Sequence, residues 1–316
     1  RFVVDHASPA PQSAHRVTFM AKMGDYFALT KPGIIGGNTI SVMGGYFLAA
    51  RGDFDLLLFL SAVVGLALVI ASGCAFNNVI DRDIDAVMSR TRTRALVQGR
   101  ITPFAALCFA TLLGIAGFAV LALGTNGLTV ALAGFGYAIY VGAYSLYMKR
   151  HSEFGTLVGS LSGAVPPVVG YCAVTNQLDA GALTLLLIFC LWQMPHSYAI
   201  AIFRMEDYRA ASIPVLPVVR GIASARRYIL GYIIAFIAAS LALVLAGYAG
   251  VGYLIVALVM GSYWLYQAVQ GYHGSDEVRW AKRVFGVSIL AITVLSVAMS
   301  LDASLLSLPP LLDRWL

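Results

Sequence analysis

Three residues with side-chain oxygen atoms recur at four-residue intervals where a long apolar segment ends. Asn77, Asp81 and Asp85, which we call the oxygen stripe, therefore share one face of the helix that this spacing predicts. An amide and two carboxylates are hard ligands of the kind that Mg²⁺ prefers, usually together with substrate phosphates. A metal there would neutralise the charge of a leaving diphosphate. The stripe thus predicts a magnesium site of three catalytic residues; the alternative is a solvated helix whose acids pair with arginines.

Two pairs of basic residues are candidates for binding the phosphate groups of a substrate. Arg90 and Arg94 follow the oxygen stripe and lie four residues apart, a spacing that allows both guanidinium groups to contact the same phosphate. Lys149 and Arg150 come directly after a later apolar segment. We expect both pairs to lie at the same side of the membrane as the stripe.

A second acid–base cluster follows another apolar segment. His196, Arg204 and Asp207 are separated by eight and three residues, which places them near one stripe of a helix. Because ionisable groups inside apolar segments are functional candidates by default, His196 is expected to bind substrate; an interhelical hydrogen bond is the alternative. Polar clusters above an apolar bundle suit an amphiphile whose anionic head lies at the water boundary.

The elements that position these clusters must be membrane helices. Hydrophobic residues make up 59% of the 316-residue chain and charged residues 11%, against about 45–50% and about 25% in soluble proteins. This composition excludes a soluble enzyme, a disordered chain and a disulfide scaffold. The net charge of +6 arises in loops and does not indicate nucleic-acid binding. We predict an all-α, polytopic membrane protein, a nine-helix bundle with spans near 32–50, 54–76, 103–123, 127–148, 154–175, 180–203, 228–249, 251–270 and 284–301.

Some boundaries depend on single features of the sequence. The apolar run from Tyr228 to Gln270 is too long for one crossing, so we divide it at Gly250 and Gly252. The span with Pro166 and Pro167 is predicted to be a kinked helix rather than a loop, because neighbouring helices can satisfy the freed carbonyls. We expect one transmembrane domain over 24–303, a polar, disordered tail without signal-peptide features over 1–23, and a short non-spanning tail over 304–316.

The basic residues also predict the orientation of the chain. With nine spans, nineteen of the 21 Lys and Arg residues fall on one side, and Arg51 and Arg314 are the two exceptions. Such a bias predicts a cytoplasmic N-terminus and active-site loops on the cytoplasmic side. The cysteines lie in apolar stretches without CxxC spacing and are expected to be small buried hydrophobic residues: Cys74, Cys108, Cys172 and Cys190.

The motifs around these residues resemble those of a known family. Residues 77–85 and 88–94 look like the first aspartate-rich motif of the UbiA intramembrane prenyltransferases. The similarity extends from Lys31 to Arg283. Further segments resemble the haem-farnesylating branch of that family, namely 31–33, 144–150, 163–167, 192–196, 203–208 and 213–217.

This resemblance implies a function and a role for each candidate residue. It implies transfer of a farnesyl group from farnesyl diphosphate to a vinyl group of haem b. The oxygen stripe would bind Mg²⁺, with Asp207 as a further ligand, and His196 would contact haem, with ligation of the haem iron as one form of that contact. In the sequence His196 stands where many members carry the first acid of a second aspartate motif, and Glu206 and Asp207 are the acids nearby. The cations on the substrate side would be Lys31, Arg90, Arg94, Lys149, Arg150 and Arg204.

Other functions remain open at this point. The first motif is shared with enzymes that prenylate aromatic quinone precursors. A secondary transporter could carry nine spans, but its coupling residues usually lie near the bilayer midplane, whereas these acids cluster at one rim. A haem carrier gives no reason for the oxygen stripe. We expect a bacterial inner membrane rather than a mitochondrial one, since no transit peptide is evident, and a haem A synthase or terminal oxidase assembly as a partner.

Overall fold

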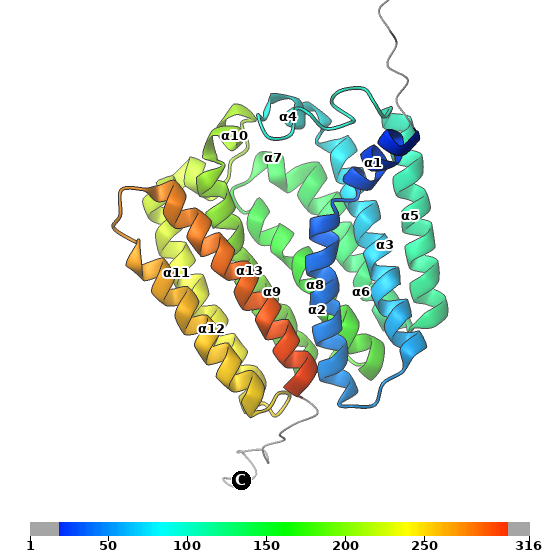
Figure 1. Ribbon diagram of the computed structural model, residues 1–316, viewed down its shortest axis with the longest axis vertical. Helices are drawn as coiled ribbons and strands as arrows, with labels where there is room; N and C mark the ends of the chain where they lie inside the picture. Colours follow the sequence, from blue (N-terminus) through cyan, green and yellow to red (C-terminus); the bar gives the residue numbers. More distant parts are fainter. Residues whose placement is uncertain (1–18, 303–316) are drawn as a thin grey trace, which may run out of the picture.

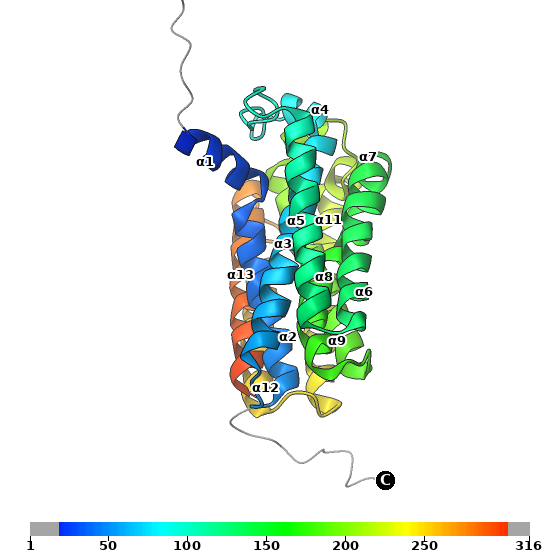
Figure 2. The same ribbon diagram turned by 90° about the vertical axis from the view of Figure 1, so that its right-hand side faces the viewer.

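The computed structural model describes residues 19–302, and every regular element within that range is helical. The predicted all-α fold is therefore confirmed. The long helices lie side by side in one bundle, and the short helices α4, α7 and α10 gather at the same end (Figure 1). A view from the side shows α1, α4 and α7 at that end as well (Figure 2). Residues 1–18 of the tail expected over 1–23, and the whole tail expected over 304–316, lie outside the described residues.

Most helices follow one another along the chain with short connections, and the longest connection, 88–102, joins α4 to α5. Several begin at a side chain that accepts hydrogen bonds from the first backbone N–H groups, as Asp55, Thr102, Asn126 and Asp179 do. The long helices are α2 (Pro32–Ala50), α3 (Leu56–Ile80), α5 (Pro103–Gly124), α6 (Gly127–Tyr137), α8 (Gly155–Thr175), α9 (Ala180–Phe203), α11 (Leu216–Leu245), α12 (Val251–Gln270) and α13 (Glu277–Asp302). The remaining elements are α1 (Phe19–Leu29), α4 (Arg82–Val87), the π-helix η1 (Ala138–Met148), α7 (Lys149–His151) and α10 (Met205–Ala210).

Eight helical segments of the described chain are long and apolar enough to cross a membrane, so this is an integral membrane protein. One of them runs continuously through α6, η1 and α7, from Gly127 to His151. Helix α2 has the length of a span, but its run of glycine and polar residues leaves it outside the eight. Nine crossings therefore stay a prediction.

The structure differs from the predicted boundaries where charged residues extend a helix. Helix α1 begins at Phe19, inside the expected tail, and α13 begins at Glu277 rather than near 284. Helix α11 begins at Leu216 rather than near 228, and its backbone is kinked at Gly221, which has a positive φ of 79°. The basic side chains near the start of α11 reach polar groups at the end of the bundle. Arg226, for example, donates to the carbonyls of Tyr272 and Gly274.

Helix α8 lies at the centre of the bundle and continues through Pro166 and Pro167. The prediction of a span here is confirmed. It packs against α2 and α9, and its contact with α2 brings two backbones together at glycines. A Cβ atom at Gly45 would lie 1.9 Å from the carbonyl oxygen of Pro167, and one at Gly170 would lie 2.1 Å from that of Val42. The prolines therefore sit in a closely packed helix rather than in a loop.

At the end of the bundle opposite α4, a buried carboxylate caps the start of a helix. Asp302, at the end of α13, is buried and accepts hydrogen bonds from the backbone N–H groups of Gly250 and Tyr253. These groups belong to the start of α12, which has no side-chain cap of its own. The predicted break between two spans near Gly250 is confirmed, and Asp302 supplies the missing cap.

The cysteines are all free, and the expectation that they are buried fails at one position. Cys74 and Cys172 are buried and Cys190 is half-buried, but Cys108 is exposed on the outer surface of α5. The apolar pattern of α5 fits a helix with an outer face that lipid covers, so an apolar residue there need not be in the protein core.

Candidate active site

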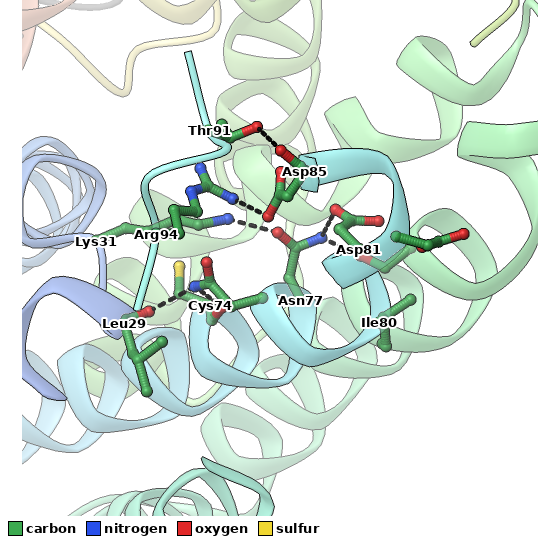
Figure 3. Close-up of polar contacts among 12 residues, drawn as sticks. Leu29, Lys31, Cys74, Asn77, Ile80, Asp81, Asp85, Thr91 and Arg94 are labelled. Atoms are coloured by element: carbon green, nitrogen blue, oxygen red, sulfur yellow. Dashed lines mark hydrogen bonds and ion pairs between the residues drawn. The ribbon is translucent and has the colours of Figure 1, made fainter. Parts of the chain in front are cut away.

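The oxygen stripe is formed where α3 continues through Asp81 into α4. Asp81 ends one helix and begins the next, so the helical spacing is kept and the three side chains point to one place (Figure 3). Asn77, Asp81 and Asp85 are only 3%, 1% and 4% exposed. Two carboxylates at this depth need charged partners, because an unpaired buried charge is strongly destabilising.

Each member of the stripe contacts a cation from a different part of the chain. The Lys31 ammonium donates to Asn77 Oδ1 over 2.5 Å. Lys149 donates to Asp81 Oδ2 over 2.5 Å, and Arg94 donates to Asp85 Oδ2 over 2.5 Å. Burial lowers the pKa of Lys31 to about 8. Three of the predicted substrate-binding cations therefore surround the stripe: Lys31, Arg94 and Lys149.

A serine of the π-helix determines how the Asn77 amide is oriented. Asn77 Nδ2 donates to Asp81 Oδ2 over 2.8 Å and to Ser145 Oγ over 3.0 Å, which directs Oδ1 toward Lys31. Ser145 is fully buried and belongs to η1, an 11-residue π-helix. Such segments are frequent at functional sites. Sequence analysis missed Ser145, because no residue pattern reveals a π-helix.

The donor atoms fit a magnesium ion. Asp81 Oδ1 is buried and has no hydrogen-bond partner, which is unusual for a carboxylate oxygen and leaves it able to bind a cation. Two carboxylates and an amide are suitable ligands for Mg²⁺ beside a diphosphate. No group of three or more His, Cys, Asp or Glu residues converges among the described residues. Asp207, the predicted further ligand, therefore does not join Asp81 and Asp85 in such a group.

Asp83 lies off the stripe, as its spacing predicts. It forms a bidentate ion pair with Arg150, with both distances 2.6 Å, and this hydrogen bonding lowers the pKa of Asp83 to about 2. Arg150 also donates to the carbonyl of Ile80 and lies 3.9 Å from Asp81. Arg150 thus stands at the edge of the site, where it fixes the junction of α3 and α4.

The two acid-bearing loops meet directly. The backbone N–H and the hydroxyl of Ser89 donate to Asp207 Oδ1 over 2.9 and 2.8 Å. Beneath this contact, Ile84 and Met88 pack against Ile213. The prediction that the clusters converge at one end of the bundle is therefore confirmed for these loops.

Two predicted cations, Arg90 and Arg204, do not pair with the oxygen stripe. Arg90 is exposed between α4 and α5. Arg204 is exposed at the junction of α9 and α10, with its guanidinium over the ring of Phe203 at 5.6 Å. In this structure neither joins the cations that contact the stripe.

His196 lies in α9 and is held by residues of α9 and α13. Its Nδ1 is 2.7 Å from Ser288 Oγ, and its ring centroid lies 4.7 Å from those of Trp192 and Phe285. Sequence analysis could not find Ser288 or Phe285, because they follow His196 by about ninety residues. The site therefore has two parts: the buried oxygen stripe with its cations, and a half-buried histidine between aromatic rings.

Comparisons with known proteins identify the family of this chain. The sequence model of the UbiA prenyltransferase family matches residues 38–292. The chain is 63% identical over 277 residues to the protoheme IX farnesyltransferase of Chromohalobacter salexigens, a match that covers 88% of this chain and 94% of that protein.

Solved structures share the fold. A structure from work on digeranylgeranylglyceryl phosphate synthase superposes with a TM-score of 0.73 at 18% identity. The superposition covers 89% of this chain and 98% of that one. A UbiA homologue from Archaeoglobus fulgidus bound to GPP and Mg²⁺ gives a TM-score of 0.60 at 14% identity, over 88% and 100%. Together with the match over most of the sequence, these findings place the chain in the UbiA prenyltransferase family.

Proposed function

We propose that this protein transfers the farnesyl group of farnesyl diphosphate to a vinyl group of haem b. One observation carries the proposal: a buried stripe of three oxygen-donor residues contacts three cations at one end of an apolar helical bundle. The stripe suits a metal-bound diphosphate, and the bundle suits a prenyl chain. The name of the relative from Chromohalobacter salexigens supports farnesyl diphosphate and haem as the two substrates.

The residues of the stripe and their cations bind the diphosphate end. When bound at the stripe, Mg²⁺ would neutralise part of the charge that develops on the leaving diphosphate. Asn77, Asp81 and Asp85 are its proposed ligands, and the magnesium-bound UbiA homologue supports this metal. Lys31, Arg94 and Lys149, which contact the stripe oxygens in this structure, would contact the diphosphate when it is bound. Arg90, Arg150 and Arg204 are proposed as outer cations, and Asp207 as an additional ligand.

The acceptor reacts within the bundle. The bond between farnesyl C1 and the diphosphate oxygen breaks, and the electron pair leaves with the diphosphate. The π electrons of the haem vinyl group form the new bond to C1. Water then adds to the resulting cation as a hydroxyl group and releases a proton. The packed helices keep bulk water from the farnesyl cation until the carbon–carbon bond has formed.

The same proposal includes the location and the use of the product. The excess of Lys and Arg at the α4 end favours a cytoplasmic N-terminus in a bacterial inner membrane. The product is more apolar than haem b and stays in the lipid phase, which favours delivery to a haem A synthase or a terminal oxidase assembly in the same membrane.

The test is mass spectrometry of the acceptor after incubation of the purified protein with farnesyl diphosphate and Mg²⁺. Haem b is expected to gain one farnesyl group and one hydroxyl group, and this gain should disappear in the presence of a chelator. 4-Hydroxybenzoate is offered in parallel as a quinone precursor. Prenylation of hydroxybenzoate with unchanged haem would overturn the proposal in favour of the other branch of the family.

A further inference from the structure

The His196 side chain is held on both faces. Its ring stacks on Trp192 with an interplanar angle of 30°, and the ring of Phe285 lies on it at 35°. Trp192 Nε1 also donates to the backbone carbonyl of Ser288 over 2.8 Å. The tryptophan therefore positions both the imidazole and the segment of α13 that carries its hydrogen-bond partner. A ring fixed in this way has few accessible rotamers.

The hydrogen bonds around Ser288 determine the tautomer of His196. Ser288 Oγ lies 2.6 Å from the carbonyl oxygen of Phe285, and a carbonyl can only accept. The single hydroxyl proton of Ser288 is therefore used in that bond. Consequently Ser288 Oγ accepts from His196, and Nδ1 is the nitrogen that carries the proton over the 2.7 Å contact. In the neutral imidazole, Nε2 then has an unshared electron pair.

This nitrogen has no hydrogen-bond partner among residues 19–302. A histidine with a purely structural role in an apolar helix would be expected to use both ring nitrogens, because an unpaired polar group in an apolar environment is costly. An electron pair that is oriented, unprotonated and unpaired is what a metal ion requires of an imidazole.

We propose that Ser288 is a positioning residue that holds His196 in this tautomer, so that His196 Nε2 ligates the iron of the porphyrin acceptor. The inference rests on the proposed function, in which haem is a substrate. A single imidazole is a common ligand of haem iron. The partner that receives the other ring N–H fixes the orientation of such a ligand, and its loss typically weakens metal binding about 10–100-fold.

The test is titration of the purified full-length protein with ferric haem b, followed by Soret absorption and resonance Raman spectroscopy. The wild type is expected to show an iron–imidazole signature that His196→Ala lacks. Ser288→Ala should weaken ferric haem binding by at least about tenfold, and Ser288→Thr should largely restore it. Ser296→Ala is the matched control. It removes a buried hydroxyl of the same helix that has no hydrogen-bond partner, and the spectrum should not change.

Iron-free protoporphyrin IX separates ligation from packing. Ser288→Ala should leave its affinity unchanged, whereas a residue that only maintains packing would weaken both porphyrins equally. The KM for farnesyl diphosphate should be the same in all variants, which also reports correct folding. An unchanged spectrum in His196→Ala, or equal loss of both porphyrins in Ser288→Ala, overturns the inference. If haem is still farnesylated in that case, the proposed function stands; if haem is bound through His196 but never farnesylated, the proposed function fails instead.

Discussion

The two acids Asp81 and Asp83 are separated by one residue and have opposite environments. Asp81 is buried, contacts Lys149, and has one oxygen without a hydrogen-bond partner; the Asp83 side chain is 66% exposed and pairs with Arg150. Asp81→Asn should therefore reduce farnesyl transfer at limiting Mg²⁺ by at least about 100-fold.

Asp83→Asn is the matched control, since it removes the same charge. An exposed ion pair contributes about 0–1 kcal/mol, so less than about a fivefold loss is expected. Mass spectrometry of the product at several Mg²⁺ concentrations measures both variants. Near-normal transfer by Asp81→Asn would exclude the metal assignment at the stripe.

Ser145 should affect the metal requirement without contacting the metal. Ser145→Ala leaves one N–H of the buried Asn77 amide without an acceptor, at a cost of about 1–3 kcal/mol, and permits the amide to turn. We expect the Mg²⁺ concentration for half-maximal transfer to rise about tenfold.

Ser160→Ala provides the comparison for this variant. Ser160 is also buried, but its hydroxyl donates only to the carbonyl of Leu157 in its own helix. Equal Mg²⁺ dependence in the two variants would show that Ser145 does not orient Asn77.

At the scale of residues, the sequence predicts what helical spacing determines. The stripe of Asn77, Asp81 and Asp85 was predictable because four-residue intervals place side chains on one helix face. Ser145 and Ser288 were not, because each meets its partner through the packing of helices far apart in the sequence. Polar residues that orient other residues have no spacing pattern of their own.

At the scale of elements, the contact between Ser89 and Asp207 connects the segment after α4 to α10. Hydrogen bonds to a charged acceptor contribute about 1.5–3 kcal/mol each. Asp207→Ala should therefore accelerate amide hydrogen exchange over residues 88–94 by at least about tenfold and lower the kcat/KM for farnesyl diphosphate.

Glu206→Ala is the control for this contact, since the Glu206 side chain is exposed and, among residues 19–302, pairs only with Arg209. Its exchange pattern should match that of the wild type. A higher Mg²⁺ requirement in Asp207→Ala with unchanged exchange would instead support the role of Asp207 as a metal ligand.

Element boundaries were predictable only where apolar residues mark them. The break near Gly250 was correct because no charge surrounds it and glycine interrupts the apolar run. The start of α11 was placed twelve residues late because Arg220, Arg226 and Arg227 suggested a loop. Their side chains extend to Glu153, to loop carbonyls or to Ser224, so helical backbone forms beneath them on both sides of a kink at Gly221.

At the scale of the whole molecule, the bundle depends on the close approach of α2 and α8. Gly170→Ala would place a methyl group against the carbonyl of Val42 and should force the helices apart. We expect a loss of about 1–3 kcal/mol, seen as a lower unfolding temperature in detergent.

A glycine without such a neighbour distinguishes helix packing from a general effect of alanine. Gly231 in α11 has no atom within 4 Å of an added Cβ. Gly231→Ala should be neutral or stabilise the helix by up to about 1 kcal/mol. A similar loss in both variants would mean that the α2–α8 contact does not limit stability.

The Asp302 carboxylate, which caps the start of α12, also determines where the chain can be truncated or extended. Truncation before Asp302 would leave the first turn of α12 without its acceptor and would loosen the last two helices together. Helix α13 ends at Asp302, at the end of the bundle opposite α4 (Figure 1), so a reporter protein or purification tag fused there would be attached away from the oxygen stripe. Such a fusion can attach the enzyme, reconstituted in a nanodisc, to a sensor surface. The end of the bundle that carries the oxygen stripe then stays accessible to substrates.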